Sequence, residues 1–131
     1  MRIATCACGA VKAECVGEPV RASMCHCLEC QRRTGSVFGV QSRWLRSQVN
    51  LAGEAKVYQR TGDTGLTVTF YFCPKCGSTV YWELPGLEDF WVVAVGAFSD
   101  PEFPAPVIAV YETRRHPWTR NPDAVLQDHW D

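Results

Sequence analysis

The sequence lacks any apolar run long enough to cross a membrane. No segment approaches the roughly 20 consecutive apolar residues that a transmembrane helix needs. The first ten residues, MRIATCACGA, also lack the apolar stretch of a secretory signal. We therefore expect a cytoplasmic protein that begins at Met1 and has no membrane partner.

The sequence also lacks an excess of charge of either sign. Its 13 Lys and Arg residues nearly balance its 14 Asp and Glu residues. Nucleic acids and acidic membranes attract proteins chiefly through clustered positive charge. The balance therefore predicts that nucleic acid is not a partner.

Helical periodicity is scarce as well. The best helical candidate runs from Leu28 to Thr34, with Gly35 in the position of a C-terminal cap. Short segments rich in β-branched and aromatic residues predict strands instead, at residues 10–15, 37–42, 55–59, 66–72, 79–82, 90–97 and 107–111. Residues 67–72 alternate at first and then become aromatic, so we expect this strand to pass from a half-exposed surface into the core. After residue 113 we expect a tail that wraps the surface before a short terminal helix.

What the chain does contain is eight cysteines in 131 residues. In a reducing cytosol disulfides seldom persist, so metal binding or thiol chemistry is the expected use of these cysteines. Only Cys15 stands apart, and we expect it to pack as a small hydrophobic residue. The other seven are too many for one tetrahedral ion, and they form three clusters: Cys6 and Cys8; Cys25, Cys27 and Cys30; Cys73 and Cys76.

The segment Cys73-Pro-Lys-Cys76-Gly77 has the form of a zinc knuckle, in which two thiolates grip one ion from a tight turn. A knuckle supplies two ligands, so a tetrahedral site needs two more from elsewhere. Cys6 and Cys8, which a glycine also follows, are one candidate pair.

The middle cluster offers three thiolates within six residues. All three can face one ion and leave the fourth position to water or a substrate, which is typical of a catalytic zinc site. Alternatively, Cys27 and Cys30 join the knuckle in one four-thiolate site of the ribbon type. The spacing leaves both arrangements open. In either case 131 residues with 47% hydrophobic content fit one domain over residues 1–131, and we predict a mainly β, antiparallel fold with little helix that zinc holds together.

Three motifs in order resemble the family of glutathione-dependent formaldehyde-activating enzymes, which includes the centromere-protein-V-like proteins. They are Cys6-x-Cys8-Gly9, Cys25-His-Cys27-x-x-Cys30 followed by Gln31-Arg-Arg-Thr34-Gly35-Ser36, and Phe72-Cys73-Pro-Lys-Cys76-Gly77-Ser78. Pro117-Trp118 is similar to the closing Pro-Trp of the family. The resemblance implies a β-rich fold with two zinc ions per chain. One is structural, on Cys6, Cys8, Cys73 and Cys76, and the other lies on Cys25, Cys27 and Cys30.

The resemblance also implies an activity. Family members join glutathione to formaldehyde as S-(hydroxymethyl)glutathione, which is formally a carbon–sulfur lyase reaction run in reverse. A zinc ion that carries three thiolates is a weak Lewis acid for making hydroxide, but it can hold an incoming thiol as thiolate. The expected partners are therefore a small thiol such as glutathione and a small aldehyde, with Cys25, Cys27 and Cys30 as the catalytic residues.

Five residues that follow the middle cluster are candidates for substrate binding. Arg32 and Arg33 suit the carboxylates of glutathione, although ordinary surface charge explains them equally well. Gln31, Thr34 and Gly35 can offer hydrogen bonds to a peptide-like ligand, but a helix cap accounts for Thr34 and Gly35 without one.

The remaining candidates are expected to be structural. His26 lies between two presumed ligands and should point to solvent or to a neighbour of the ligands. His116 and His129 should lie on the surface. Ala109 aligns with a position where relatives often carry histidine, which weakens transfer of the family activity to this chain. The aromatic residues of the strand segments, Trp82, Phe90 and Trp91, should belong to the core.

Two other functions compete with the enzyme. The first is a non-enzymatic zinc module that binds a protein partner, as ribbon-type domains do. The second is a thiol redox switch built on the middle cluster, which predicts a disulfide there and zinc release on oxidation.

Overall fold

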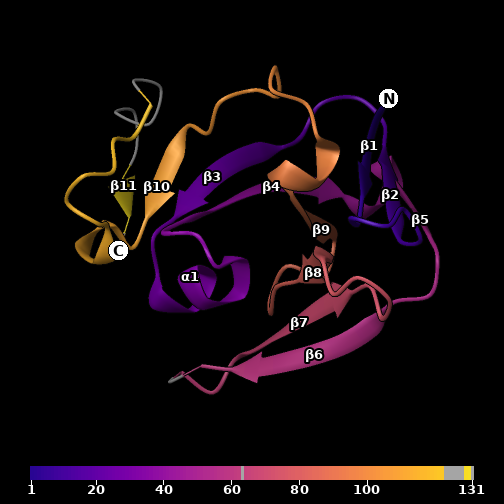
Figure 1. Ribbon diagram of the computed structural model, residues 1–131, viewed down its shortest axis with the longest axis horizontal. Coiled ribbons are helices and arrows are strands. Elements are labelled where there is room, and N and C mark those ends of the chain that lie inside the picture. Colours follow the sequence, from indigo (N-terminus) through magenta and orange to yellow (C-terminus); the bar gives the residue numbers. More distant parts are fainter. Residues whose placement is uncertain (63, 123–128, 131) are drawn as a thin grey trace.

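The computed structural model describes residues 1–62, 64–122 and 129–130. Within these residues, strands form one three-stranded sheet and one eight-stranded sheet, and they confirm the predicted mainly β fold (Figure 1). No helix in this described part of the chain has the length and apolar character that a membrane crossing requires.

The small sheet is antiparallel and lies beside the large one (Figure 1). Its order is β1 (Arg2–Thr5), β2 (Lys12–Cys15) and β5 (Val49–Ala52). The order in the large sheet is β11 (His129–Trp130), β10 (Ile108–Val110), β3 (Arg21–Cys25), β4 (Gly39–Leu45), β9 (Phe90–Ala94), β8 (Thr79–Glu83), β7 (Thr67–Phe72) and β6 (Lys56–Thr61).

The large sheet departs from the antiparallel expectation at one end. There β10 runs parallel to both β3 and β11, so the sheet is mixed. Between β3 and its parallel neighbour β10 the chain forms helix α1 and strands β4 to β9. Such a long crossover is what a parallel pairing requires, because a tight hairpin can join only antiparallel strands.

The helix predicted at residues 28–34 is confirmed with its predicted bounds. Helix α1 spans Leu28–Thr34, and the backbone N–H of Cys30 donates to the Sγ atom of Cys27 at its N-cap over 3.2 Å. Gly35 ends the helix in the left-handed region at φ 72°, and its N–H donates to the carbonyl of Gln31 over 2.8 Å. Short 3-10 turns occur elsewhere, namely η1 (Arg46–Gln48), η2 (Val95–Phe98) and η3 (Glu112–Arg114).

Several strands differ from their predictions. Strands β1, β3 and β5 were not predicted from the sequence, and β3 is the instructive case because four of its five residues are buried. A strand that is buried on both faces shows no alternation, and Arg-Ala-Ser-Met-Cys lacks the β-branched residues that mark strands. The predicted strand 90–97 ends at Ala94, where the chain tightens into η2.

Two further expectations concern strand β7 and the C-terminal segment. In β7 only Phe70 is buried, and Tyr71 and Phe72 remain half-exposed, so the strand does not run into the core as expected. The predicted terminal helix falls largely on residues 123–128, which lie outside the described residues, and residues 129–130 belong to β11. Trp82 is buried as predicted, whereas Phe90 and Trp91 are only half-buried.

The large sheet curls so that its two ends face each other across helix α1. Figure 1 shows α1 in the opening between β3 and β4 on one side and β6 and β7 on the other. Side-chain contacts span this opening: the Arg33 guanidinium lies 4.4 Å from the ring centre of Trp82 in β8, and Arg60 in β6 lies 4.0 Å from Glu29 in α1. The curl therefore creates an enclosed space beside the helix.

Candidate metal centres

Two turns from distant parts of the chain bring four cysteines together. Cys6 and Cys8 lie between β1 and β2, and Cys73 and Cys76 lie between β7 and β8. The four Sγ atoms lie within 4.8 Å of one another. Neighbouring sulfurs are 3.7 Å apart for Cys6 and Cys8 and 3.6 Å apart for Cys8 and Cys73. A tetrahedral zinc ion with bonds of about 2.3 Å separates its sulfurs by about 3.8 Å, so this four-cysteine cluster matches the size of a closed zinc site.

The two turns have the same backbone design. The N–H of Cys6 donates to the carbonyl of Val11, and the N–H of Cys73 donates to the carbonyl of Ser78, each over 3.0 Å. In each turn a second backbone N–H points at the first sulfur: Val11 N is 3.2 Å from the Sγ atom of Cys6, and Lys75 N is 3.3 Å from that of Cys73. Such N–H donors favour thiolate, which is the form of cysteine that binds metal.

The second turn also makes its exposed cysteine more acidic. A hydrogen bond with the Ser78 hydroxyl lowers the pKa of Cys76 to about 5. Gly77, at φ 81°, follows this cysteine in a conformation that a residue with a Cβ resists. The first cysteine of each turn is buried and the second is exposed, so the ion they can hold lies at the edge of the core.

A second group, the three-cysteine cluster, lies at the opposite end of the curled sheet from the small sheet. Cys25 ends β3, Cys27 caps α1, and Cys30 lies within that helix. Their Sγ atoms also lie within 4.8 Å of one another. Among the described residues, no fourth cysteine, histidine, aspartate or glutamate brings a ligand atom within that distance of all three. The structure thus groups Cys27 and Cys30 with Cys25 and not with the knuckle.

The three thiols share their protons unequally. Hydrogen bonds from the Cys25 and Cys30 thiols lower the pKa of Cys27 to about 2. Hydrogen bonding to Cys27 in turn raises the pKa of Cys25. One thiolate is thus surrounded by two thiols that keep their protons, and a cation in the cluster would replace those protons. A set of three thiolates suits zinc, which prefers sulfur and nitrogen ligands.

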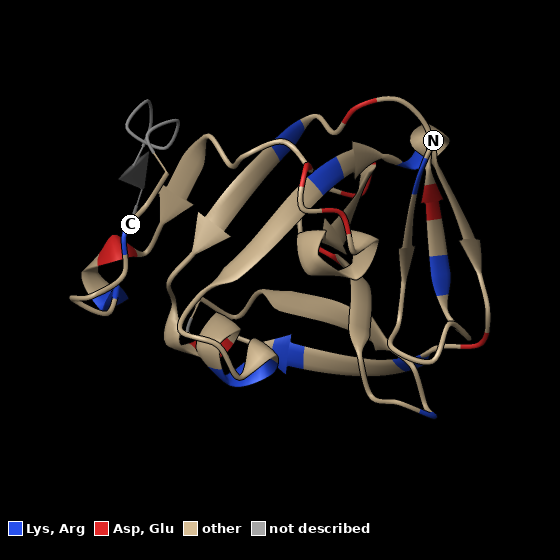
Figure 2. Ribbon diagram, turned by 45° about the horizontal axis from the view of Figure 1, so that its top comes forward, with Lys and Arg blue, Asp and Glu red and all other residues tan. Residues whose placement is uncertain are grey.

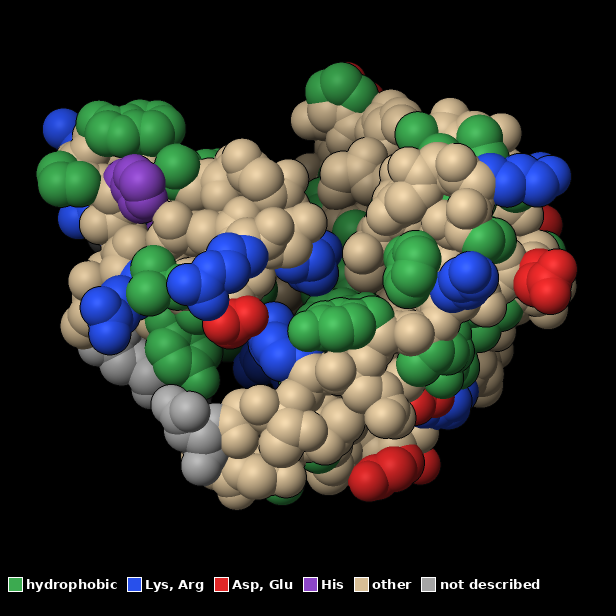
Figure 3. Space-filling view, turned by 60° about the horizontal axis from the view of Figure 1, so that its bottom comes forward, with side chains coloured by type: hydrophobic (Ala, Val, Ile, Leu, Met, Phe, Trp, Pro, Cys, Tyr) green, Lys and Arg blue, Asp and Glu red, His purple; other side chains and the backbone are tan. Residues whose placement is uncertain are grey.

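The three-cysteine cluster faces a cavity of about 420 Å³, here called the cysteine cavity. Its walls are mostly apolar and include Val68, Phe70, Trp82, Leu84, Val110 and Tyr111. Arg33 and Arg60 supply positive charge at its edge. In Figure 3 basic and hydrophobic side chains gather around a hollow on this face of the molecule. The open side of the cluster therefore leads into a space that can hold a small molecule.

The predicted substrate contacts divide into two groups. Gln31 is engaged within the protein, because its amide Nε2 donates to the carbonyl oxygens of His26 and Arg114 and its Oε1 lies 2.9 Å from His116 Nε2. Thr34 closes the helix end: its hydroxyl donates to the carbonyl of Cys30 and accepts from the N–H of Ser36. Gly35 is the cap itself. These three residues hold α1 and the segment after β10 in place.

The arginines behave differently from one another. Arg32 is exposed and pairs with Glu29 at 2.9 Å. Arg33 is half-buried, and its Nε and Nη2 atoms have no hydrogen-bond partner among the described residues. Arg60, which was not predicted as a site residue, lies 4.0 Å from Glu29 of α1. Figure 2 shows Lys and Arg (blue) both on the helix and on the end of a strand beside it. The segment Lys-Val-Tyr-Gln-Arg-Thr of β6 carries no site motif, so the sequence offered no signal for Arg60.

The remaining candidates take mostly structural positions. His26 is fully buried, and its Nε2 lies 3.1 Å from the side-chain oxygen of Asn121, so it contacts the C-terminal segment and not solvent. His116 is half-buried against Gln31 and is not the free surface residue that the sequence suggested. Cys15 is buried in the core as predicted, and burial raises its pKa to about 12. Ala109 is buried beside Met24. The side chain of His129 lies outside the described part.

Comparison with known proteins agrees with this geometry. The family model described as glutathione-dependent formaldehyde-activating enzyme matches residues 1–114, a range that contains both cysteine clusters. The chain belongs to this family. A crystal structure of a Rhodobacter sphaeroides protein has a TM-score of 0.57 and 20% identity, and the match covers 98% of this chain and 99% of that one. At this identity the likeness extends to the fold alone. No curated protein matches the chain.

Proposed function

We propose that this family member joins a small thiol to a small aldehyde at a zinc ion held by Cys25, Cys27 and Cys30. The reaction is of the carbon–sulfur lyase type, and S-(hydroxymethyl)glutathione is the product that family membership suggests. One observation supports the proposal above all: three sulfurs converge and face a cavity instead of a fourth protein ligand. A second zinc ion, on Cys6, Cys8, Cys73 and Cys76, serves the fold.

The donor set favours thiol chemistry over hydrolysis. When bound, a zinc ion with three thiolate ligands holds an incoming thiol as thiolate and is a poor activator of water. The protein supplies the rest through placement. Apolar side chains such as Val68 and Leu84 limit water in the cavity, and a sulfur held there is already positioned for an aldehyde carbon.

The arginines are proposed to orient the substrates. Arg33, which lines the cysteine cavity and has no carboxylate partner among the described residues, receives a carboxylate of one substrate, and Arg32 contributes positive charge nearby. We propose that Gln31, Thr34 and Gly35 act by fixing α1 and thereby the positions of Cys27 and Cys30. Of these five residues, Arg33 is the one that lines the cysteine cavity.

The proposal includes a reducing compartment, such as the cytoplasm. All eight cysteines lie in the described part of the chain and are free thiols, including the closely spaced sulfurs of both clusters. Oxidation would join those sulfurs and prevent metal binding. We propose that residues 1–131 form one domain, because their length and hydrophobic content fit a single core.

The decisive experiment measures the exchange of glutathione with formaldehyde by two-dimensional exchange NMR. Zinc-loaded protein should accelerate exchange above the rate in buffer alone, and Cys27→Ser should return it to that rate. The matched control is Cys15→Ala, which removes a buried cysteine that lies outside both clusters. An exchange rate that the wild-type protein leaves unchanged, while the protein carries two zinc ions, would remove the enzymatic proposal.

A further inference from the structure

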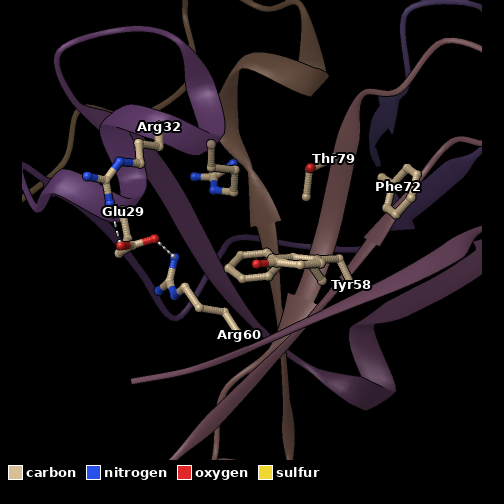
Figure 4. A pocket seen from close by; sticks show the side chains of 8 residues that line it. Glu29, Arg32, Tyr58, Arg60, Phe72 and Thr79 are labelled. Atoms are coloured by element: carbon tan, nitrogen blue, oxygen red, sulfur yellow. Dashed lines mark hydrogen bonds and ion pairs between the residues drawn. The ribbon is translucent and has the colours of Figure 1, made fainter. Parts of the chain in front are cut away.

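A second cavity adjoins the cysteine cavity. It measures about 410 Å³ and is here called the aromatic cavity, after Tyr58, Phe70 and Phe72 in its wall (Figure 4). The two cavities share four lining residues, which form the boundary between them: Glu29, Arg33, Arg60 and Phe70. The proposed function places the reacting sulfur and carbonyl groups at the cysteine cavity and assigns no ligand group to the aromatic wall of this second space.

One wall of the two cavities is a row of aromatic rings across three neighbouring strands. Tyr58 in β6 pairs directly with Phe70 in β7, and Phe70 pairs directly with Trp82 in β8. The rings of Tyr58 and Phe70 are stacked at 6.5 Å with 25° between their planes, and those of Phe70 and Trp82 are 5.7 Å apart. This aromatic row offers a continuous surface on which a planar apolar group can stack.

Two guanidinium groups lie over the row. Arg33 lies 4.4 Å from the ring centre of Trp82, and Arg60 lies 5.2 Å from that of Phe70. Among the described residues, Tyr58 is the ring of the row with no guanidinium over it, and its side chain is largely exposed at the cavity. A planar group therefore finds a free ring at Tyr58 and positive charge directly beside it.

The charges of the aromatic cavity favour one anion. Its lining contains Arg32, Arg33 and Arg60 but a single carboxylate, that of Glu29. Glu29 binds Arg32 at 2.9 Å and lies 4.0 Å from Arg60, as the dashed lines in Figure 4 mark. Arg33, by contrast, lines both cavities and pairs with no carboxylate among the described residues. A carboxylate ligand fits the fork of such an unpaired guanidinium.

We propose that the aromatic cavity binds a planar aromatic carboxylate, with Arg33 as the residue that selects its charge and Tyr58 as the residue that selects its ring. This inference rests on the proposed function for its role in the reaction: the aldehyde or thiol substrate carries an aromatic acid that occupies the second cavity while its reactive end reaches the three-cysteine cluster. The binding of the acid itself does not depend on catalysis.

The test uses zinc-loaded protein and 4-fluorobenzoate, whose binding is followed by fluorine NMR. Matched probes are 4-fluorobenzamide, which has the ring without the charge, and acetate, which has the charge without the ring. The benzoate should bind at least about tenfold more tightly than either probe, because each lacks one of the two contacts. Equal binding of the benzamide and the benzoate would overturn the role of Arg33.

Variants separate the two contacts. Arg33→Gln should weaken benzoate binding by about tenfold and leave benzamide binding unchanged. Tyr58→Ala should weaken both ring-bearing probes by about threefold to tenfold. Lys56→Gln and Val57→Ala are the controls, since both are exposed residues of β6 that line neither cavity. Benzoate binding that survives Arg33→Gln in a protein with the wild-type unfolding temperature would reject the proposal.

The exchange assay then connects binding with reaction. Addition of a thiol to 4-carboxybenzaldehyde forms a carbon–sulfur bond and moves the thiol proton to the carbonyl oxygen, so no oxidant or reductant is needed. The protein should accelerate this addition more than that of benzaldehyde, and Arg33→Gln should remove the difference. If benzoate binds as expected but no aldehyde is accelerated, the proposed function fails while the binding site stands. If formaldehyde exchange is accelerated but benzoate does not bind, the proposed binding site fails while the proposed function stands.

Discussion

Both cysteine clusters present sulfur atoms, but they differ in where their cysteines lie in the chain and in what surrounds them. In the four-cysteine cluster every ligand comes from a tight turn, and the turns lie up to 70 residues apart in sequence, from Cys6 to Cys76. In the three-cysteine cluster all ligands lie within six residues, at the junction of β3 and α1. The first arrangement brings two hairpins together, whereas the second joins only β3 and α1 and faces a cavity. Under the proposed function, the position of a ligand set in the chain distinguishes the structural metal from the reactive one.

The largest effect should come from breaking the four-cysteine cluster. Cys76 is exposed, so Cys76→Ser removes a ligand with little loss of packing. Structural zinc sites contribute about 10–16 kcal/mol in small zinc domains, which is comparable to the whole stability of a typical domain. We expect the variant to lose its fold, as measured by circular dichroism and amide NMR dispersion. Cys76→His should restore both zinc and fold, because a Cys3His site is equally acceptable to zinc. A folded Cys76→Ser protein with the wild-type unfolding temperature would contradict the structural role.

The second prediction concerns the three-cysteine cluster and rests on the acidity of Cys27. Neighbouring thiols lower its pKa to about 2, so in protein freed of the ion at the three-cysteine cluster it remains a thiolate at every pH above that value. Its rate of alkylation should be constant between pH 5 and 7. A free thiol with a pKa near 8.5 should react about a hundredfold faster at pH 7 than at pH 5. Mass spectrometry of the labelled peptide measures this rate, and a hundredfold rise at Cys27 would show that its proton is not shared as described.

The lowered pKa of Cys27 also determines how the stability of the fold changes with pH. A thiol whose pKa is lower in the folded state stabilises the fold at and above its unfolded pKa. That contribution declines as the pH falls toward the folded value of about 2. The free energy of unfolding of the protein without an ion at the three-cysteine cluster should therefore fall gradually below neutral pH. Chemical unfolding curves measured from pH 7 to pH 4 would detect this trend. The Cys27→Ser variant should lack this part of the pH dependence.

Chelation offers a milder contrast between the clusters. An ion with three protein ligands and an open position should leave at least about tenfold faster than one enclosed by four. Zinc release to a coloured chelator should therefore proceed in two phases of equal amplitude, and the fast phase should disappear in Cys27→Ser. Release in one phase from the wild-type protein would mean that the two ions are held alike.

The smallest effect concerns the support of the three-cysteine cluster. Gly35 ends α1 at φ 72°, and an alanine there costs about 1–2 kcal/mol. Gly35→Ala should lower the free energy of unfolding by this amount without altering the zinc content. Gly96→Ala is the control, because its φ is outside the left-handed region and nothing lies within 4 Å of the added Cβ. Denaturant titration compares the two, and an equal loss in both would exclude a specific role for the cap.

Helix α1 and the cysteine groups were predictable because each has a local signal. The helix is bounded by Cys27 and Gly35, which satisfy its ends from within the sequence. The knuckle is likewise a complete local unit. Its partner pair was one candidate among others until the family resemblance favoured it, because no local feature says which distant turn a knuckle meets.

The rest depended on tertiary structure. Strand β3 is recognisable only by its position between β10 and β4, since its small buried residues carry no strand pattern of their own. Arg60 acquires its significance from the curl of the sheet, which brings β6 opposite α1. Likewise, nothing in the residues around Gln31 indicates that its amide binds Arg114 and His116, more than 80 residues later.

Cys27 carries two duties on one sulfur atom, since it belongs to the three-cysteine cluster and also accepts the N–H of Cys30 at the start of α1. Any event at that sulfur, whether metal loss, alkylation or arrival of a substrate, changes the strength of this hydrogen bond. The rate at which the Cys30 amide hydrogen exchanges with deuterium should therefore report whether the site is occupied, in the unmodified protein and without any added label.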